Sequence, residues 1–118
     1  MLITYIMEKF SEIIDTYLLN YDLYENGKVE FECDYGELIF FKRDRNILIL
    51  FGICIFPEYR QKGLCRNILH YLIDKSSEKF KYVLVESVLS KVLYEYLLRF
   101  EYKNRKFKRV YEGFLYKN

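Results

Sequence analysis

A nearly unbroken apolar run, Ile47 to Phe56, is the feature that most constrains how this 118-residue chain can fold. Its length and its β-branched residues predict a central strand that is covered on both faces. Pro57 ends the run, and a short basic loop with one glycine, residues 60–63, leads directly into an amphipathic helix. This order is typical of a phosphate-binding arrangement, because the first-turn amides of a helix are free to bind an anion. Arg60, Lys62 and Arg66 add positive charge around that point.

Length and composition favour one folded domain and exclude several classes of protein. Apolar residues make up 52% of the chain and charged residues 31%, so the chain can bury a core without metal or disulfide. The net charge of +2 does not by itself favour nucleic acid as a partner. No apolar run approaches the roughly 18–20 residues of a membrane span, and the start of the chain does not resemble a signal peptide.

Cysteine and histidine usage favours a cytoplasmic protein without a metal site. The three cysteines, Cys33, Cys54 and Cys65, are odd in number and lack the spacing of metal ligands. The single histidine, His70, makes a structural zinc site improbable. We therefore expect reduced thiols and a cytoplasmic location.

Hydrophobic spacing elsewhere alternates between strand and helix periods. Residues 1–6 fit either a first strand or the start of a helix, and from Glu8 the spacing is helical. The remaining elements are expected as strands at 28–35, 37–42 and 47–56, a helix at 63–76, a strand at 82–86, a helix at 88–98, and strands at 102–107 and 110–116. The order (β)-α-β-β-β-α-β-α-β-β predicts an antiparallel meander followed by a right-handed parallel crossover.

This order, together with the segment from Pro57 to Arg66, resembles the GNAT superfamily of acyl-coenzyme A-dependent N-acetyltransferases. The family's pyrophosphate loop reads Arg/Gln-x-x-Gly-x-Gly/Ala, and Arg60, Gly63 and Cys65 stand at its marked positions. The family also has a tyrosine shortly before a Gly-Phe pair; here Tyr94 precedes Arg99-Phe100. The resemblance implies a small GNAT-like α/β (α+β) domain over residues 1–118, with a mixed central sheet and helices on both faces.

The resemblance also implies acetyl-coenzyme A as co-substrate and assigns its contacts. Backbone groups of residues 53–55 would bind the pantetheine arm, and amides of residues 61–66 would hold the pyrophosphate. Ser87 and Ser90 stand where the family often keeps an asparagine and a small residue beside that arm. The implied cofactor-binding residues are Ile53, Cys54, Ile55, Arg60, Gln61, Lys62, Gly63, Leu64, Cys65, Arg66, Ser87 and Ser90.

Acetyl transfer from a thioester to an amine needs a group that accepts the amine's proton and one that protonates the leaving thiolate. The resemblance gives the second role to Tyr94, with Tyr96 as an alternative. Glu86, at the end of its strand, is the candidate base, and the alternative is a solvated carboxylate at a strand edge; Glu58 is a further candidate. Cys54 and Cys65 are expected to be buried thiols, because nothing in the sequence ties His70 to either of them.

Taken together, these features favour an N-acetyltransferase that transfers acetyl from acetyl-coenzyme A to a primary amine. The brief N-terminal helical region suggests an open groove, which suits a protein or peptide amine. An alternative is a weak or inactive GNAT-like module that binds coenzyme A or a protein partner. The basic segment 101–109 has three interpretations: a patch for an acidic protein or RNA, a solvated hairpin whose alternate residues pack inward, or a site that attracts the 3′-phosphate and adenine end of coenzyme A. Exposed edges of the terminal strands are compatible with a homodimer.

Overall fold

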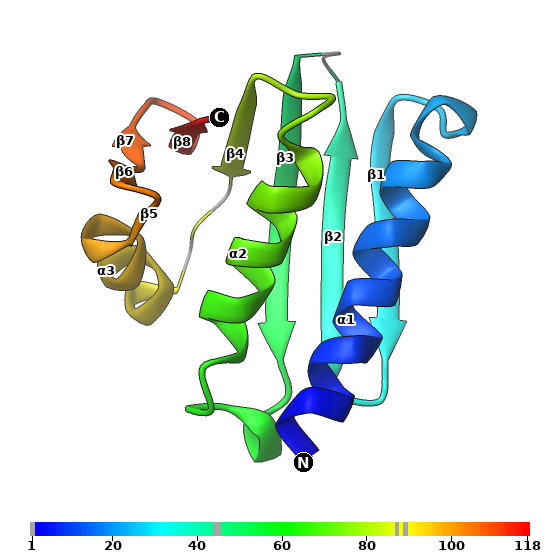
Figure 1. Cartoon of the computed structure of the whole chain (residues 1–118), viewed down its shortest axis with the longest axis vertical. Coiled ribbons are helices and arrows are strands. Elements are labelled where there is room, and N and C mark those ends of the chain that lie inside the picture. Colours follow the sequence, from blue (N-terminus) through cyan, green and yellow to red (C-terminus); the bar gives the residue numbers. More distant parts are fainter. Residues whose placement is uncertain (1, 44–45, 87, 89) are drawn as a thin grey trace.

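The computed structural model describes residues 2–43, 46–86, 88 and 90–118, and it places a twisted sheet behind a layer of helices (Figure 1). Three α-helices, eight strands and two short 3-10 turns, at Tyr21–Leu23 and Pro57–Tyr59, make up the described residues. In chain order the helices and strands are α1 (Leu2–Leu19), β1 (Gly27–Cys33), β2 (Gly36–Lys42), β3 (Ile47–Ile55), α2 (Leu64–Ser76), β4 (Tyr82–Glu86), α3 (Lys91–Arg99), β5 (Glu101–Tyr102), β6 (Arg105–Lys106), β7 (Lys108–Arg109) and β8 (Gly113–Lys117).

The main sheet has six strands in the order β1-β2-β3-β4-β8-β7. Strands β1, β2 and β3 form the expected antiparallel meander, and β3 pairs with β4 in parallel through the crossover helix α2. The remaining pairs, β4 with β8 and β8 with β7, are antiparallel. The predicted mixed α/β fold is therefore confirmed.

Helix α1 resolves the choice that the sequence left open for residues 1–6. Ile6, Phe10, Ile14 and Tyr17 lie on one helical stripe, and all four are fully buried. Because Ile6 continues the stripe of the later residues, burial of that face extends the helix back to Leu2.

The three helices share one face of the sheet, whereas helices on both faces were expected. α1 and α2 lie side by side across the sheet (Figure 1). The ring of Tyr94 in α3 contacts that of Phe114, which is paired with Val85 and therefore points to the same side. A common core explains this arrangement, because Leu50 and Val85 from the sheet and Leu97 from α3 belong to one buried cluster.

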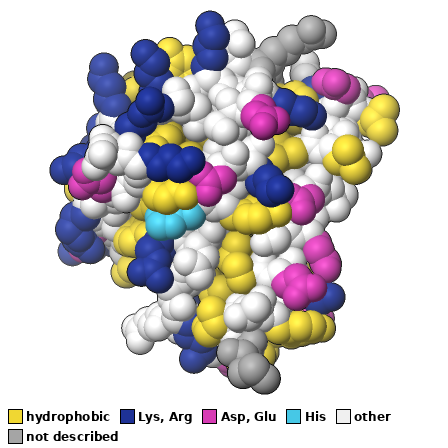
Figure 2. All heavy atoms as spheres, viewed as in Figure 1, with side chains coloured by type: hydrophobic (Ala, Val, Ile, Leu, Met, Phe, Trp, Pro, Cys, Tyr) yellow, Lys and Arg dark blue, Asp and Glu magenta, His cyan; other side chains and the backbone are white. Residues whose placement is uncertain are grey.

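Charged side chains are unevenly distributed over this helical face. Lys and Arg gather over α3 and the short strands that follow it, on the left of Figure 2, whereas Asp and Glu lie mostly toward α1. The strand β3 runs between these two regions (Figure 1).

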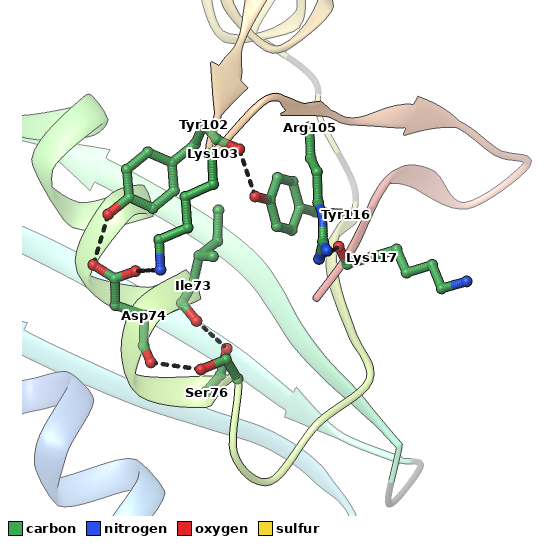
Figure 3. Close-up of polar contacts among 9 residues, drawn as sticks. Ile73, Asp74, Ser76, Tyr102, Lys103, Arg105, Tyr116 and Lys117 are labelled. Atoms are coloured by element: carbon green, nitrogen blue, oxygen red, sulfur yellow. Dashed lines mark hydrogen bonds and ion pairs between the residues drawn. The ribbon is translucent and has the colours of Figure 1, made fainter.

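The strand predicted at 102–107 is wrong: these residues form a tight hairpin of two two-residue strands, β5 and β6. Lys103 and Asn104 make the turn, with φ of 54° and 60° in the left-handed region, so the chain reverses where a continuous strand was expected. Asp74 in α2 holds the hairpin in place. It accepts a 2.7 Å hydrogen bond from the Tyr102 hydroxyl and forms a 2.7 Å ion pair with Lys103 (Figure 3). The ring of Tyr102 also stacks on His70, with centroids 3.9 Å apart.

Tyr17 is the central aromatic of the core and gives a test of the packing. Its ring stacks on Phe40 with centroids 4.1 Å apart, and its buried hydroxyl has no hydrogen-bond partner among the described residues. We expect Tyr17→Phe to leave the free energy of unfolding unchanged or higher, because the change removes only an unsatisfied polar group. Tyr17→Ala should lower it by about 3–5 kcal/mol through the cavity it leaves. Urea unfolding of both variants measures this, and a loss above about 1 kcal/mol in Tyr17→Phe would contradict the packing described.

Candidate active site

Strands β3 and β4 part before β3 ends. The parallel register pairs Ile47–Leu50 with Tyr82–Val85 and goes no further in the described residues. β3 continues to Ile55, and its other edge stays paired with β2 as far as Gly36. The backbone of residues 53–55, expected to bind the pantetheine arm, therefore lies in the part of β3 that has a partner strand on one side only.

The loop that follows β3 has the backbone shape of an anion-binding turn. Gln61 and Gly63 both adopt left-handed conformations, with φ of 61° and 77°, and successive residues of opposite hand turn their amides toward a common point. The Arg60 side chain fastens the loop to the strand, since its Nε donates to the Ile55 carbonyl at 2.7 Å. Gly63 is the residue before α2, and a side chain there would be strained by the left-handed φ.

The N-terminus of α2 presents amides and positive charge at the same place. Gly63 makes no side-chain cap, so the first-turn amides of the helix receive no bond from that residue. A Cβ added at Gly63 would lie 3.1 Å from the Arg66 guanidinium, which places that cation over the loop. Gln61 and Lys62 are exposed. The helix dipole and these side chains together favour a bound anion.

The side chains of Leu64 and Cys65 turn inward, so the cysteine at the position of a small family residue packs on the core. Burial raises the pKa of the Cys65 thiol to about 11, even though it lies in the first turn of a helix. A thiol in this state is a poor nucleophile, in agreement with the sequence-based expectation. His70 is occupied by its stack on Tyr102, and its pKa is lowered by burial and by Arg66, with Asp74 opposing.

Tyr94 and Tyr96 lie in different surroundings. The Tyr94 hydroxyl accepts a hydrogen bond from the Arg109 guanidinium, which also stands over the Tyr94 ring at 4.8 Å. Tyr96 faces the start of α2. Its pKa is raised to about 12, mainly by burial and in smaller part by the nearby Cys65, while Arg66 acts to lower it. Tyr94 therefore has an exposed cationic partner, whereas Tyr96 is half-buried against the loop.

Glu86 is the last residue of β4, next to the point where β3 and β4 part. Its Oε2 accepts from Arg43 at 3.0 Å, and its side chain is only 13% exposed. The alternative of a solvated carboxylate at a strand edge does not describe this environment. The other candidate base, Glu58, is exposed in the turn after β3.

Of the two serines expected near the pantetheine arm, Ser90 is the N-cap of α3 and accepts from the Leu93 amide at 3.3 Å. This bond accounts for Ser90 through the helix start alone. Ser87 lies outside the described residues.

A polar cavity of about 580 Å³ lies away from this loop, between the end of α1 and the end of β2. Three cations of the described residues line its wall: Lys42 Nζ donates to the Tyr21 and Tyr24 carbonyls, Lys79 Nζ donates to the Leu18 carbonyl, and Arg43 pairs with Glu86. Lys42 and Lys79 stabilise the chain around the end of α1, and neither the loop at 60–63 nor the start of α2 lines this cavity. In the part of the chain that the structure describes, no three His, Cys, Asp or Glu side chains form a metal-binding group. None of its helices is long and apolar enough to cross a bilayer.

Solved structures with the same architecture identify the fold. A proposed acetyltransferase from Exiguobacterium sp. 255-15 aligns with a TM-score of 0.52 at 11% identity, over 88% of this chain and 74% of its own. A GNAT family acetyltransferase from Elizabethkingia anophelis, determined with acetyl-CoA bound, aligns with a TM-score of 0.50 at 16% identity, over 89% of this chain and 80% of its own. The fold is GNAT-like. No protein-family profile and no curated protein sequence matches the chain.

Within this GNAT-like fold, two arginine contacts were not predicted from the sequence. Arg43 reaches Glu86 across 43 positions of the chain, and Arg109 reaches Tyr94 across 15. The sequence contained only a partial signal for the second, because Arg109 belonged to the basic segment 101–109 without a partner being expected.

The raised pKa of the half-buried Cys65 thiol leads to a pH test. Since its pKa is raised to about 11, we expect alkylation by iodoacetamide to quicken about tenfold per pH unit from about pH 8 to about pH 10. Mass spectrometry of the labelled peptide gives the rate at this residue. The same peptide in urea-unfolded protein is the control and should level off near the ordinary thiol pKa. A plateau below about pH 9 in folded protein would contradict the raised pKa of the Cys65 thiol.

Proposed function

We propose that this protein is an N-acetyltransferase that transfers an acetyl group from acetyl-coenzyme A to a primary amine. The proposal rests on one observation. The end of β3, which is paired with β2 but not with β4 among the described residues, leads into the N-terminus of α2, which has no side-chain cap. These two features supply a strand edge and an anion site in sequence, as a long ligand with a diphosphate requires.

The chemical groups of these residues suit the parts of coenzyme A, and they follow one another along the chain in the same order as those parts. Residues 53–55 offer backbone donors and acceptors to an amide-containing arm. The left-handed Gln61 and Gly63 and the first-turn amides of α2 suit a diphosphate. Lys62 and Arg66 are cations beside it, while Arg60 is better explained as the residue that holds the loop on β3.

When bound, acetyl-coenzyme A supplies an acetyl group activated as a thioester. A backbone amide of residues 53–55 would stabilise negative charge on the thioester oxygen. Tyr94 suits the role of proton donor, because its hydroxyl oxygen accepts from Arg109 and its own proton stays available. Glu86 is our candidate base: Arg43 engages its Oε2, and the second oxygen could take the amine's proton, directly or through water.

A catalytically inactive module that binds coenzyme A or a protein partner is the second candidate. The pairing of Glu86 with Arg43 favours it, because the carboxylate oxygen that accepts from the guanidinium is not free to take the amine's proton. Coenzyme A binding without acetyl transfer to any amine would select this alternative.

Binding of coenzyme A tests the site directly. We expect Lys62→Ala and Arg66→Ala each to weaken binding about three- to tenfold, because each removes a cation next to the phosphates. Isothermal titration calorimetry measures the affinity. Lys81→Ala is the matched control, since Lys81 is exposed before β4, at the other end of the sheet. Equal affinity for coenzyme A in the wild type and the three variants would exclude the loop as the phosphate site.

The proposed proton transfers are tested by kinetics with saturating acetyl-coenzyme A. We expect Tyr94→Phe to lower kcat by about a hundredfold with little change in KM for the coenzyme, and Tyr96→Phe to leave kcat near wild type. Glu86→Gln should remove the acidic limb of the kcat/KM pH profile. Wild-type kcat in Tyr94→Phe, or an unchanged pH profile in Glu86→Gln, would remove the respective residue from the proposal.

A further inference from the structure

Positive charge is concentrated in the last part of the chain. Residues 99–118 carry seven of the 19 Lys and Arg residues and two of the 17 Asp and Glu residues, which gives this segment a net charge of +5 and residues 1–98 a net charge of −3. Figure 2 shows Lys and Arg side chains gathered on the side of the molecule where α3 and the short strands lie, apart from most acidic side chains. We call this region the basic surface; its members are Arg99, Lys103, Arg105, Lys106, Lys108, Arg109 and Lys117.

Some cations of the basic surface form contacts within the protein, and others have no ion-pair partner among the described residues. Lys103 pairs with Asp74, and Arg105 donates to the Lys117 carbonyl at 3.2 Å (Figure 3). Lys106 and Lys108 are exposed, and neither forms an ion pair with any of the described residues. Folding therefore does not account for these two lysines.

The basic surface extends to the proposed transfer site. Arg109 contacts the Tyr94 hydroxyl. Gly113, at the other end of the turn after β7, is opposite Glu86 in the sheet and so close to β4 that an added Cβ would lie 2.0 Å from the Val85 carbonyl oxygen. This turn carries Tyr111, whose side chain is fully exposed. Because side chains alternate along a strand, Arg109 faces the helical side of the sheet with Tyr94, whereas Lys108 faces the other side, as Glu86 does. A molecule lying along the outer edge of β7 would reach both sides.

The size and surroundings of the basic surface favour a short anionic chain over a long one. β7 is two residues long and is the last strand of the sheet, so its outer side has no neighbour in the described sheet order. The net −3 of the rest of the molecule repels an extended polyanion that leaves the basic surface. A peptide with a few carboxylates near one amine meets neither difficulty.

We propose, resting on the N-acetyltransferase function above, that the acceptor is the amine of an acidic peptide segment held by Lys106 and Lys108. The carboxylates of the acceptor pair with Lys106 and Lys108, while its amine lies near Tyr94 and Glu86. The basic surface thereby selects acceptors by charge and speeds their association.

The test compares two synthetic peptides with one lysine each, one flanked by glutamates and the other by glutamines. We expect kcat/KM at low salt to be at least about tenfold higher for the glutamate peptide, and this preference to fall as salt is raised. Lys106→Glu with Lys108→Glu should abolish the preference and leave KM for acetyl-coenzyme A unchanged. Lys28→Glu with Lys81→Glu is the control with the same change in net charge on residues outside the basic surface, and it should keep the preference.

Several outcomes would overturn this inference without touching the proposed function. These are equal kcat/KM for the two peptides, a preference that does not depend on salt, or a rise in KM for acetyl-coenzyme A in the Lys106/Lys108 variant. Fluorescence anisotropy of the labelled peptides without coenzyme reports docking separately from transfer. Salt-sensitive binding of the glutamate peptide that the variant loses would support the surface even if no transfer were found. Tighter, variant-sensitive binding of a single-stranded RNA oligonucleotide would instead identify nucleic acid as the partner.

Discussion

Strand β3 keeps β2 beside it to its end but loses β4 after Leu50, and the candidate site depends on this parting. The first half of the strand is anchored, since Leu48, Ile49 and Leu50 are fully buried. Among the residues that the structure describes, the second half has no β4 partner on one backbone edge, and it leads the chain to the loop before α2. The same strand thus secures the core and positions backbone groups for a ligand.

Arginine contacts organise the polar groups around this opening. Arg60 fastens the loop to the end of β3, Arg43 holds Glu86, and Arg109 holds the Tyr94 hydroxyl. Arg60 lies shortly after β3 and Arg109 is in β7, whereas Arg43 follows β2 and reaches past β3 to Glu86 at the end of β4, so the sheet order determines how far each guanidinium must reach. Lys62, Lys106 and Lys108 form no ion pair within the described residues. In our proposals Lys62 binds phosphate at the start of α2, and Lys106 and Lys108 bind carboxylates beside β7.

The sequence predicted those features that depend on local patterns. The strand β3, the alternation in β1 and the Gly63 start of α2 follow from hydrophobic period and backbone preference, and the structure contains them. The cover expected on both faces of β3 does not extend along the strand, because only Leu48–Leu50 are buried. A hairpin was one interpretation of the segment 101–109, but its turn at Lys103-Asn104 was missed, because neither residue is a glycine and the left-handed turn is stabilised by tertiary contacts to Asp74 and His70. Two features depend on the order of the strands in the sheet: the packing of all three helices on one face, and the partners of Glu86 and Tyr94. The spacing of residues in a single sequence does not reveal that order.

The central claim is that the free end of β3 and the start of α2 form one coenzyme A site. Titration of ¹⁵N-labelled protein with coenzyme A, followed by amide chemical shifts, tests both halves at once. We expect saturable shifts at Ile53–Ile55 and at Leu64–Arg66, with the amides of Val29–Phe31 in β1 unmoved. Shifts confined to the cavity around Tyr21 and Lys42, or none at millimolar coenzyme, would contradict the claim.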